Sequence, residues 1–363
     1  MALESALRSN LSSRTSLLET QFDLVFGSNI KTNITSNSTA KSGYELPIVG
    51  LRLSEGQFLS LHIPAIVCIL CGLVGSGIVI YRSSFSNFSR NRKRFFKRSK
   101  SERFVIYIAL CDACFNVFHL MDHIHVIITR YHVHPKYLCV FYAATILEFI
   151  CAQLLMVNIV AINIFVLIYF GKDINFGRYD WRILLWMFGF PFLIVILAIS
   201  LDILGPNGMF CFFDGIKGRI YDAFFVSLPI VAIIIFNIVL YSLTWQKIRN
   251  VEMNFKSVCG RKTSTVRKSE QAVKKMSLFV LVFFIQWIPC AVYCVWYSIA
   301  RDVPMLLIQF GTTFTNIGGV LNAIVYFFIR PKSNARDNSE ITRKNVVSKA
   351  GSTGNHVFST KSY

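Results

Sequence analysis

Residues 276–300 read MSLFVLVFFIQWIPCAVYCVWYSIA and contain no charged side chain. A helix needs about 20 predominantly apolar residues to cross the hydrocarbon core of a membrane. Six further runs of this kind lie at residues 58–81, 104–128, 136–170, 183–204, 222–245 and 305–329. The seven runs hold about half of the 363 residues, and Lys136 is the single Lys or Arg among them. The sequence therefore predicts an all-α integral membrane protein, a bundle of seven transmembrane helices.

The composition excludes most soluble proteins. Hydrophobic residues make up 54% of the chain and charged residues only 16%, a balance typical of proteins that lie in lipid. The formal net charge is +19, which in an apolar chain indicates basic loops beside anionic lipid headgroups. Nucleic acid is not an expected partner, because its binding needs basic residues on a water-exposed fold.

The segments between the runs differ in their content of basic residues. Of the 38 Lys and Arg residues, 28 lie in four segments, 82–103, 171–182, 246–275 and 330–363. Short cytoplasmic loops carry the excess of Lys and Arg in membrane proteins. These four segments are therefore expected in the cytoplasm, which places the N-terminus outside the cell and the C-terminus inside.

Three potential glycosylation acceptors begin at Asn10, Asn33 and Asn37. Such acceptors are modified only on the lumenal side of a membrane, which agrees with the orientation predicted from the charges. The expected organisation, in a multi-pass protein of the plasma membrane, is an extracellular glycosylated segment at 1–57, a helix bundle at 58–329 and a cytoplasmic tail at 330–363.

Two of the ten cysteines are set apart by their position. Cys139 opens the third run, and Cys211 lies in the loop between the fourth and fifth runs, on the expected outer side. The others lie inside apolar runs, except for Cys259 in a cytoplasmic segment. Because the outer side is oxidising, we expect a disulfide that ties the loop to the top of the third helix. Two free thiols are the alternative.

Ionisable side chains at membrane depth are costly and usually mark functional positions. The runs contain four carboxylates of interest, Asp112, Asp122, Glu148 and Asp202. His119 and His123 lie within about one helical turn of Asp122. Imidazole and carboxylate groups bind metals, but no other run offers a matching pair of ligands. We therefore expect no metal, and interpret these residues as lining a ligand pocket or packing within the bundle.

The chain lacks the motifs of the common enzyme classes, including H-E-x-x-H, G-x-S-x-G and the Walker loop. Neither catalysis nor a cofactor is predicted. A different class of function remains open, namely a transporter or channel in which Asp112, Asp122 and Glu148 line a path for protons or cations.

Three motifs carry a resemblance to a known family. Phe283-Phe-Ile-Gln-Trp287-Ile-Pro289 is similar to F-x-x-C-W-x-P, Asn322-Ala-Ile-Val-Tyr326 to N-P-x-x-Y, and Ala109-Leu-Cys-Asp112 to A-x-x-D. Their order on the sixth, seventh and second runs, together with Cys139, Trp186, Cys211 and Pro229, resembles the rhodopsin-like G-protein-coupled receptors over residues 58–330. Residues 204–213 and 318–326 also resemble the cyclic-AMP-receptor-like and fungal nutrient receptors.

The residue types in these motifs have physical consequences. Pro289 lacks a backbone N–H, which weakens the sixth helix and permits a kink. Trp287 is a bulky neighbour that we expect beneath a ligand pocket, and an ordinary kinked helix with a core aromatic is the alternative. The resemblance implies that Trp287 and Pro289 form a switch. It also implies a polar core made of Asp112, Gln153, Asn322 and Tyr326, and leaves sodium binding by Asp112 open.

The chain also departs from the family pattern. The third run ends at residues 163–170 without D-R-Y, so the usual arginine lock is missing. Ile146 stands where amine receptors carry an Asp, so a cationic ligand lacks that counter-ion. The basic segment 246–275 is expected to meet anionic lipid and to dock a G protein.

The predicted function is a G-protein-coupled receptor that transduces an extracellular ligand of unknown type into activation of a heterotrimeric G protein. Its expected partners are that ligand, the G protein and the lipid bilayer. The predicted ligand-binding residues are His119, Asp122, His123, Glu148, Trp287 and Tyr293.

Overall fold

The computed structural model describes residues 42–45, 47–48, 55–85, 95–259, 264–300 and 303–329. The predicted glycosylation sites at Asn10, Asn33 and Asn37 lie outside the described residues, as does the predicted cytoplasmic tail.

Helices account for nearly all of the described chain. The first three apolar runs form single helices, and the fourth and fifth runs each contain a π-helical turn. Along the chain the elements are η1 Gly43–Glu45, α2 Glu55–Phe85, η2 Phe95–Lys97, α3 Lys100–Thr129, α4 Lys136–Phe170, η3 Arg178–Asp180, α5 Trp181–Leu184, the π-helical turn η4 Leu185–Gly189, α6 Phe190–Ser200, β1 Leu204–Pro206, β2 Cys211–Phe213, α7 Arg219–Asp222, the π-helical turn η5 Ala223–Ser227, α8 Leu228–Cys259, α9 Ser264–Ile299, α10 Met305–Asn316 and α11 Gly318–Ile329.

Six helical segments of the described chain are long and apolar enough to cross a membrane. The seventh predicted span, 305–329, differs from a single helix because it is divided into α10 and α11 at Ile317. The N–H of Ile317 bonds to the carbonyl of Phe314, which tightens the last turn of α10. α8 also extends beyond 245, where the apolar run ends, and continues to Cys259 through residues that are no longer predominantly apolar.

Local sequence explains where several helices begin and end. Ser99 accepts a hydrogen bond from the N–H of Glu102, and the Glu102 side chain accepts one from the N–H of Ser99, so a capping box starts α3. Gly171 adopts φ 65° directly after α4, a left-handed conformation that glycine favours and that stops the helix.

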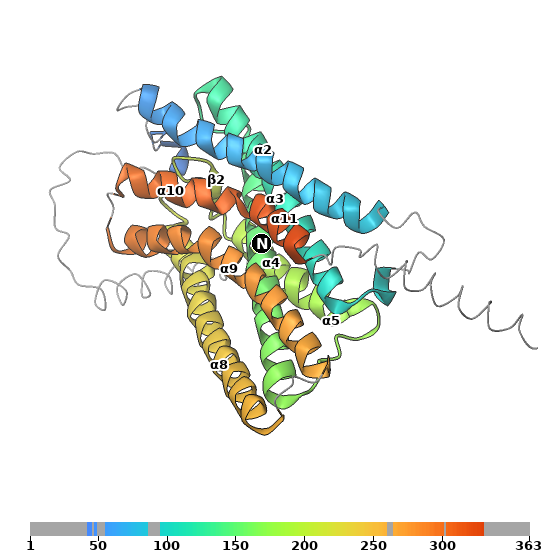
Figure 1. Cartoon of the computed structure of the whole chain (residues 1–363). Coiled ribbons are helices and arrows are strands. Elements are labelled where there is room, and N and C mark those ends of the chain that lie inside the picture. Colours follow the sequence, from blue (N-terminus) through green and yellow to red (C-terminus); the bar gives the residue numbers. More distant parts are fainter. Residues whose placement is uncertain are drawn as a thin grey trace, which may run out of the picture.

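The helix α4 is the central member of the bundle (Figure 1). It contacts α3, α6, α8, α9 and the β-hairpin. In its most apolar stretch 72% of the residues are buried, against 28–56% in the other five candidate spans. Helices α3, α6, α8 and α9 therefore surround α4, whereas α2 packs mainly against α3, and the seventh-span helices α10 and α11 pack mainly against α9 and α2.

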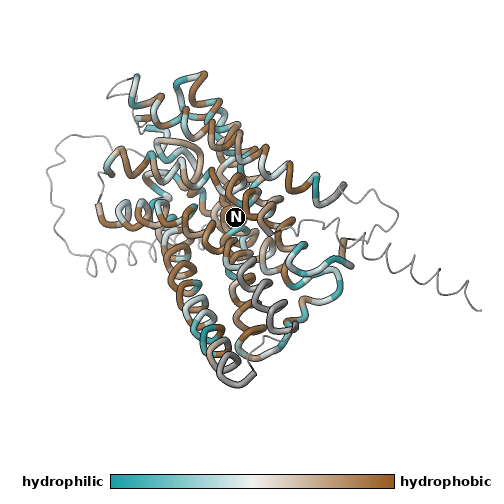
Figure 2. Tube along the Cα trace, viewed as in Figure 1, coloured by the Kyte–Doolittle hydropathy of each residue, from teal (hydrophilic) through white to brown (hydrophobic). Residues whose placement is uncertain are grey.

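The outward faces of the helices are apolar. Large hydrophobic side chains such as Val74, Ile128, Leu193 and Phe328 are more than 60% exposed. Figure 2 shows hydrophobic residues along most of the helices, with hydrophilic residues gathered toward loops and helix ends. An apolar surface of this extent is expected against lipid and not against water, so the chain is a multi-pass membrane protein.

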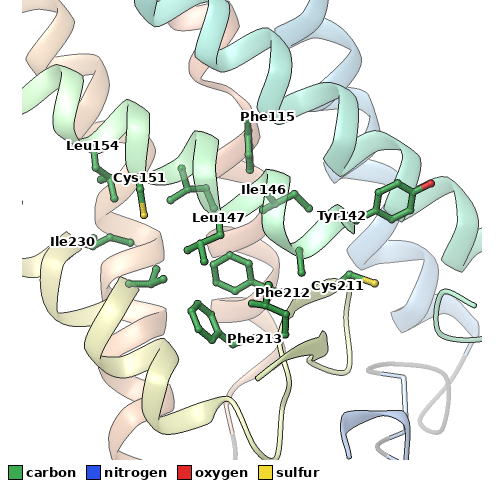
Figure 3. Close-up of a cluster of buried hydrophobic side chains, with 14 of the residues drawn as sticks. Phe115, Tyr142, Ile146, Leu147, Cys151, Leu154, Cys211, Phe212, Phe213 and Ile230 are labelled. Carbon is green, nitrogen blue, oxygen red and sulfur yellow. The ribbon is translucent and has the colours of Figure 1, made fainter. Parts of the chain in front are cut away.

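The two strands β1 and β2 form an antiparallel hairpin that covers one end of the bundle, the hairpin end. Phe212 and Phe213 of β2 belong to the main buried cluster and lie beside Leu147 and Ile146 of α4 (Figure 3). The predicted disulfide is confirmed, since Cys139 and Cys211 are bonded and join α4 to β2.

The short helix η1 fastens a further segment onto the hairpin end. The hydroxyl of Ser42 and the N–H of Gly43 both donate to Oδ2 of Asp214, which follows β2. The Tyr44 hydroxyl donates to the carbonyl of Val133 at 3.1 Å. Burial, together with the charges of Asp214 and Asp122, raises the pKa of Tyr44 to about 12, so this hydroxyl keeps its proton at neutral pH.

Replacing both Cys139 and Cys211 by serine should destabilise the protein, because the bond closes a loop between residues 72 positions apart. A loop of this size predicts a loss of about 2–5 kcal/mol, measured as a lower melting temperature of the purified protein. Cys71→Ala, at an exposed free cysteine, is the control and should melt like the parent. Equal melting temperatures for all three proteins would contradict the prediction.

Candidate ligand cavity and polar core

A cavity of about 80 Å³ lies between the hairpin and the surrounding helices. Three of the six predicted ligand-binding residues line it, namely His119 of α3 and Trp287 and Tyr293 of α9. Asp122, His123 and Glu148 are not among its lining residues. The cavity therefore brings together half of the residues expected to bind a ligand.

The wall of the cavity is largely aromatic and aliphatic. Trp287 is 1% exposed and lies two residues before Pro289 within α9. Tyr293 and Tyr297 stack one helical turn apart, with ring centroids separated by 5.8 Å. The hairpin and neighbouring helices complete the wall with Met209, Phe210, Phe212, Phe213, Ile146, Ile150 and Ile308. Such a wall favours a ligand with an apolar body.

Three buried histidines lie together between α2, α3 and α10. The Nδ1 atoms of His62 and His123 are 2.7 Å apart, so one of these nitrogens must carry a proton that the other accepts. The rings of His119 and His123 are 4.5 Å apart, and Nδ1 of His119 lies 2.9 Å from Oδ1 of Asn316. Within the described residues no three His, Cys, Asp or Glu side chains are arranged to hold a metal ion. The cluster joins three helices by polar contacts.

Asp122 is fully buried behind the cavity wall. Its Oδ2 accepts a hydrogen bond of 2.7 Å from the backbone N–H of Cys211. Its Oδ1 has no hydrogen-bond partner among the described residues. The carboxylate therefore ties α3 to the hairpin beside the disulfide.

Glu148 of α4 lies away from the cavity. It lies close to Cys111 of α3 and to Cys151, one turn further along α4. Its Oε2 is buried and unpartnered within the described part of the chain. Glu148 therefore belongs to the contact between α3 and α4.

The polar core lies between α3, α4, α9 and the seventh-span helices. Asn322 donates a 2.7 Å hydrogen bond to Oδ2 of Asp112, so these two residues face each other. Oε1 of Gln153 accepts a hydrogen bond of 3.4 Å from Nε2 of Gln286, and within the described residues Gln153 has no hydrogen bond to Asp112 or Asn322. The Ser83 hydroxyl donates to the Tyr326 hydroxyl at 3.3 Å.

Gln286 is the residue of this region that the sequence analysis passed over. It stands where the resembling motif has Cys, and its side chain donates to the carbonyl of Thr315 at 2.8 Å as well as to Gln153. A Cβ at Gly318 would come within 2.5 Å of the Gln286 amide, so glycine is needed for this approach. Gln286 could have been selected from the sequence because it is a polar residue inside the apolar run 276–300.

A second missed contact lies at the end of the bundle opposite the hairpin. Arg103 of α3 donates to both carboxylate oxygens of Asp180, at 2.5 and 2.9 Å. Tyr107 donates to the same carboxylate at 3.2 Å. Both charged side chains are less than 10% exposed. Arg103 and Asp180 lie just outside the apolar runs, so a search for charged residues within the runs could not find them.

Three charged residues that the sequence analysis did not select also line the cavity, namely Asp214, Arg219 and Asp222. Asp222 is the first residue of the run 222–245, so the rule that selected Asp112 and Asp122 applied to it as well. Asp214 and Arg219 lie in the loop before that run, where charges are common and carry little signal.

Comparison with known proteins is informative at the level of fold. No family model matches the chain, and no curated protein sequence matches it. Among solved structures, the crystal structure of squid rhodopsin matches 83% of this chain and 88% of that chain, with a TM-score of 0.60 and 16% sequence identity. The chain therefore has the rhodopsin-like seven-helix fold.

Asp122→Ala should destabilise the protein, because it leaves the buried N–H of Cys211 without an acceptor, a loss of about 1–3 kcal/mol. Asp122→Asn keeps an acceptor oxygen and removes a buried charge, so it should melt at or above the temperature of the parent. Thermal melting of the three purified proteins checks the order. The prediction fails if the asparagine variant is the less stable of the two.

Asp180→Ala should also destabilise the protein, because it leaves the buried Arg103 guanidinium without its partner, at about 3–5 kcal/mol. The matched control is Asp173→Ala, which removes an exposed ion pair with Lys100 and should change stability by less than about 1 kcal/mol. Chemical denaturation in detergent compares the two variants. Equal losses of stability in the two variants would contradict the prediction that the buried ion pair of Arg103 and Asp180 contributes more than the exposed pair.

Proposed function

We propose that this rhodopsin-like bundle is a G-protein-coupled receptor. A ligand enters the cavity at the hairpin end and biases the equilibrium between two packings of the helices. One observation carries the proposal: α9 contributes Trp287 to the cavity wall and the adjacent Gln286 to the polar core. A change at the ligand is thereby coupled to the contacts between α9, α4 and α10.

The helix α9 is suited to such coupling. Pro289 interrupts its hydrogen-bond ladder close to Trp287 and Gln286, so the two halves of the helix can change their relative angle at low cost. The bonds from Gln286 to Thr315 and Gln153 hold one arrangement. Loss of these bonds favours the other arrangement.

The proposed orientation places the hairpin end outside the cell. Disulfides persist in oxidising compartments, so the bond between Cys139 and Cys211 supports an extracellular position for this end. The basic segments support a cytoplasmic position for the other end. In this orientation the N-terminal segment is extracellular and glycosylated, and the protein lies in the plasma membrane.

The proposed G-protein docking surface lies at the opposite end, on α8 and α9. α8 continues to Cys259 although its apolar run ends at residue 245, and α9 begins at Ser264 although its apolar run begins at residue 276. Both helices thus extend beyond the hydrocarbon core. Without D-R-Y at the end of α4, the buried pair of Arg103 and Asp180 is the proposed restraint on this surface.

A transporter or channel is less well supported. That function requires Asp112, Asp122 and Glu148 to line one path, but none of them lines the cavity. Asp112 bonds to Asn322 and Asp122 to the Cys211 backbone. These contacts fix the two carboxylates in separate places.

Trp287→Ala and Asp112→Asn should change the signal while surface expression persists. Loss of one contact worth about 1 kcal/mol changes a two-state equilibrium about fivefold. The measurement is agonist-free G-protein activation in overexpressing cells, normalised to surface receptor, with current and solute uptake recorded in the same cells.

Ile128→Ala, at a side chain that is 75% exposed on the bundle surface, is the control and should signal like the parent. If Trp287→Ala and Asp112→Asn also signal like the parent, the assigned switch is wrong. Ion or solute flux without G-protein activation would favour the transporter.

A further inference from the structure

We infer that the ligand carries a cationic group, an amine or a guanidinium, and that its counter-ion is Asp222, the last residue of α7 and the first residue of the fifth apolar run. This inference rests on the proposed receptor function and specifies the chemistry of its ligand. It also differs from the arrangement in amine receptors, whose Asp lies in the third transmembrane span. The corresponding residue of this chain is Ile146 of α4.

The first observation is that Asp222 is a buried carboxylate on the cavity wall. It is 8% exposed and lines the cavity. Within the described residues its side chain has neither a hydrogen bond nor an ion pair. An ionised carboxylate that is buried without a partner is strongly unfavourable, and a cation in the cavity is the group that would stabilise the ionised form of Asp222.

The nearest basic residue does not serve as that partner. Arg219 lies three residues earlier and donates to the backbone carbonyls of Tyr297 and Ala300. Its guanidinium also lies 4.6 Å from the centre of the Tyr297 ring. Arg219 is therefore committed to the end of α9, and the carboxylate of Asp222 remains available.

The other carboxylate on the wall is already satisfied. Asp214 accepts hydrogen bonds from the Ser42 hydroxyl and from the N–H groups of Gly43, Ile216 and Lys217. Four donors complete the coordination of a carboxylate. A ligand cation should therefore bind at Asp222 and not at Asp214.

Aromatic rings beside Asp222 fit the same ligand. Tyr293 and Tyr297 line the same cavity as Asp222, and their rings stack with an interplanar angle of 11°. The face of a tyrosine ring attracts a cation within about 6 Å. A carboxylate beside stacked tyrosines is a suitable site for an ammonium or guanidinium group.

The backbone at this point is irregular. Asp222 ends α7, and the π-helical turn η5 begins at the next residue, Ala223. A π-helical turn inside an α-helix is rare and frequently marks a functional position. The hydrophobic remainder of the wall, including Phe210 and Ile308, favours a ligand whose cationic group is joined to an apolar body.

The experiment uses the purified full-length protein and three small probes that differ in charge. These are 2-phenylethylamine, the neutral 2-phenylethanol and the anionic phenylacetate, each at millimolar concentration. We expect the amine to raise the melting temperature and to bind in an equilibrium assay, and the alcohol and the acid to do neither.

Asp222→Asn should weaken amine binding by about 10- to 100-fold, as expected for a charge-assisted contact. Asp222→Glu keeps the charge and should retain binding within about tenfold of the parent. Asp202→Asn, at an exposed acid paired with Lys136 and Lys217, is the control and should bind like the parent.

The inference is overturned if the amine does not bind, if the alcohol or the acid binds equally well, or if Asp222→Asn binds like the parent. The comparison of three probes on the parent requires no variant to fold. G-protein activation by the parent separates the two proposals. Activation without amine binding refutes the cation site alone, whereas amine binding through Asp222 without activation refutes the receptor function alone.

Discussion

The absence of water from the hydrocarbon core determines most of this structure, because every polar group inside the spans has to find its partner within the protein. Helices meet this requirement for the backbone. Side chains meet it in pairs that join neighbouring helices, as Asn322 does with Asp112 and Gln286 with Thr315. The groups that remain incomplete are therefore informative, and among the described residues Asp222 is one that lies on the cavity wall.

The same constraint explains how the cavity and the opposite end can be coupled. Interhelical hydrogen bonds hold discrete arrangements, and a well-packed interior shifts between arrangements more readily than it deforms. Pro289 provides a weak point in α9, and the interruption at Ile317 provides another in the seventh span. Gly318 allows Gln286 to reach across between them. A ligand that moves Trp287 thus acts on the contacts of Gln286, which lie near the irregularities at Pro289 and Ile317.

The sequence predicted the fold well and the site only in part. Apolar runs of about 20 residues have few alternatives to a membrane helix, and the isolation of Cys139 and Cys211 identified the disulfide. Gln153 was expected beside Asp112 and instead meets Gln286, because the side of α4 that faces each neighbour depends on packing. His62 was not considered, although it contacts His123 across 61 residues. The pairing of Arg103 with Asp180 spans 77 residues and was likewise not predicted from the sequence.

The sequence by itself determined the number of apolar spans, the cysteines that pair and the residues with unusual chemistry inside the spans. These properties depend on local composition and on solvent, which act on each segment separately. Only the tertiary structure decided that Asp214 is saturated while Asp222 is open, and that Arg219 is committed to the end of α9. Partners of this kind come from distant segments, and their meeting depends on the packing of all the helices together.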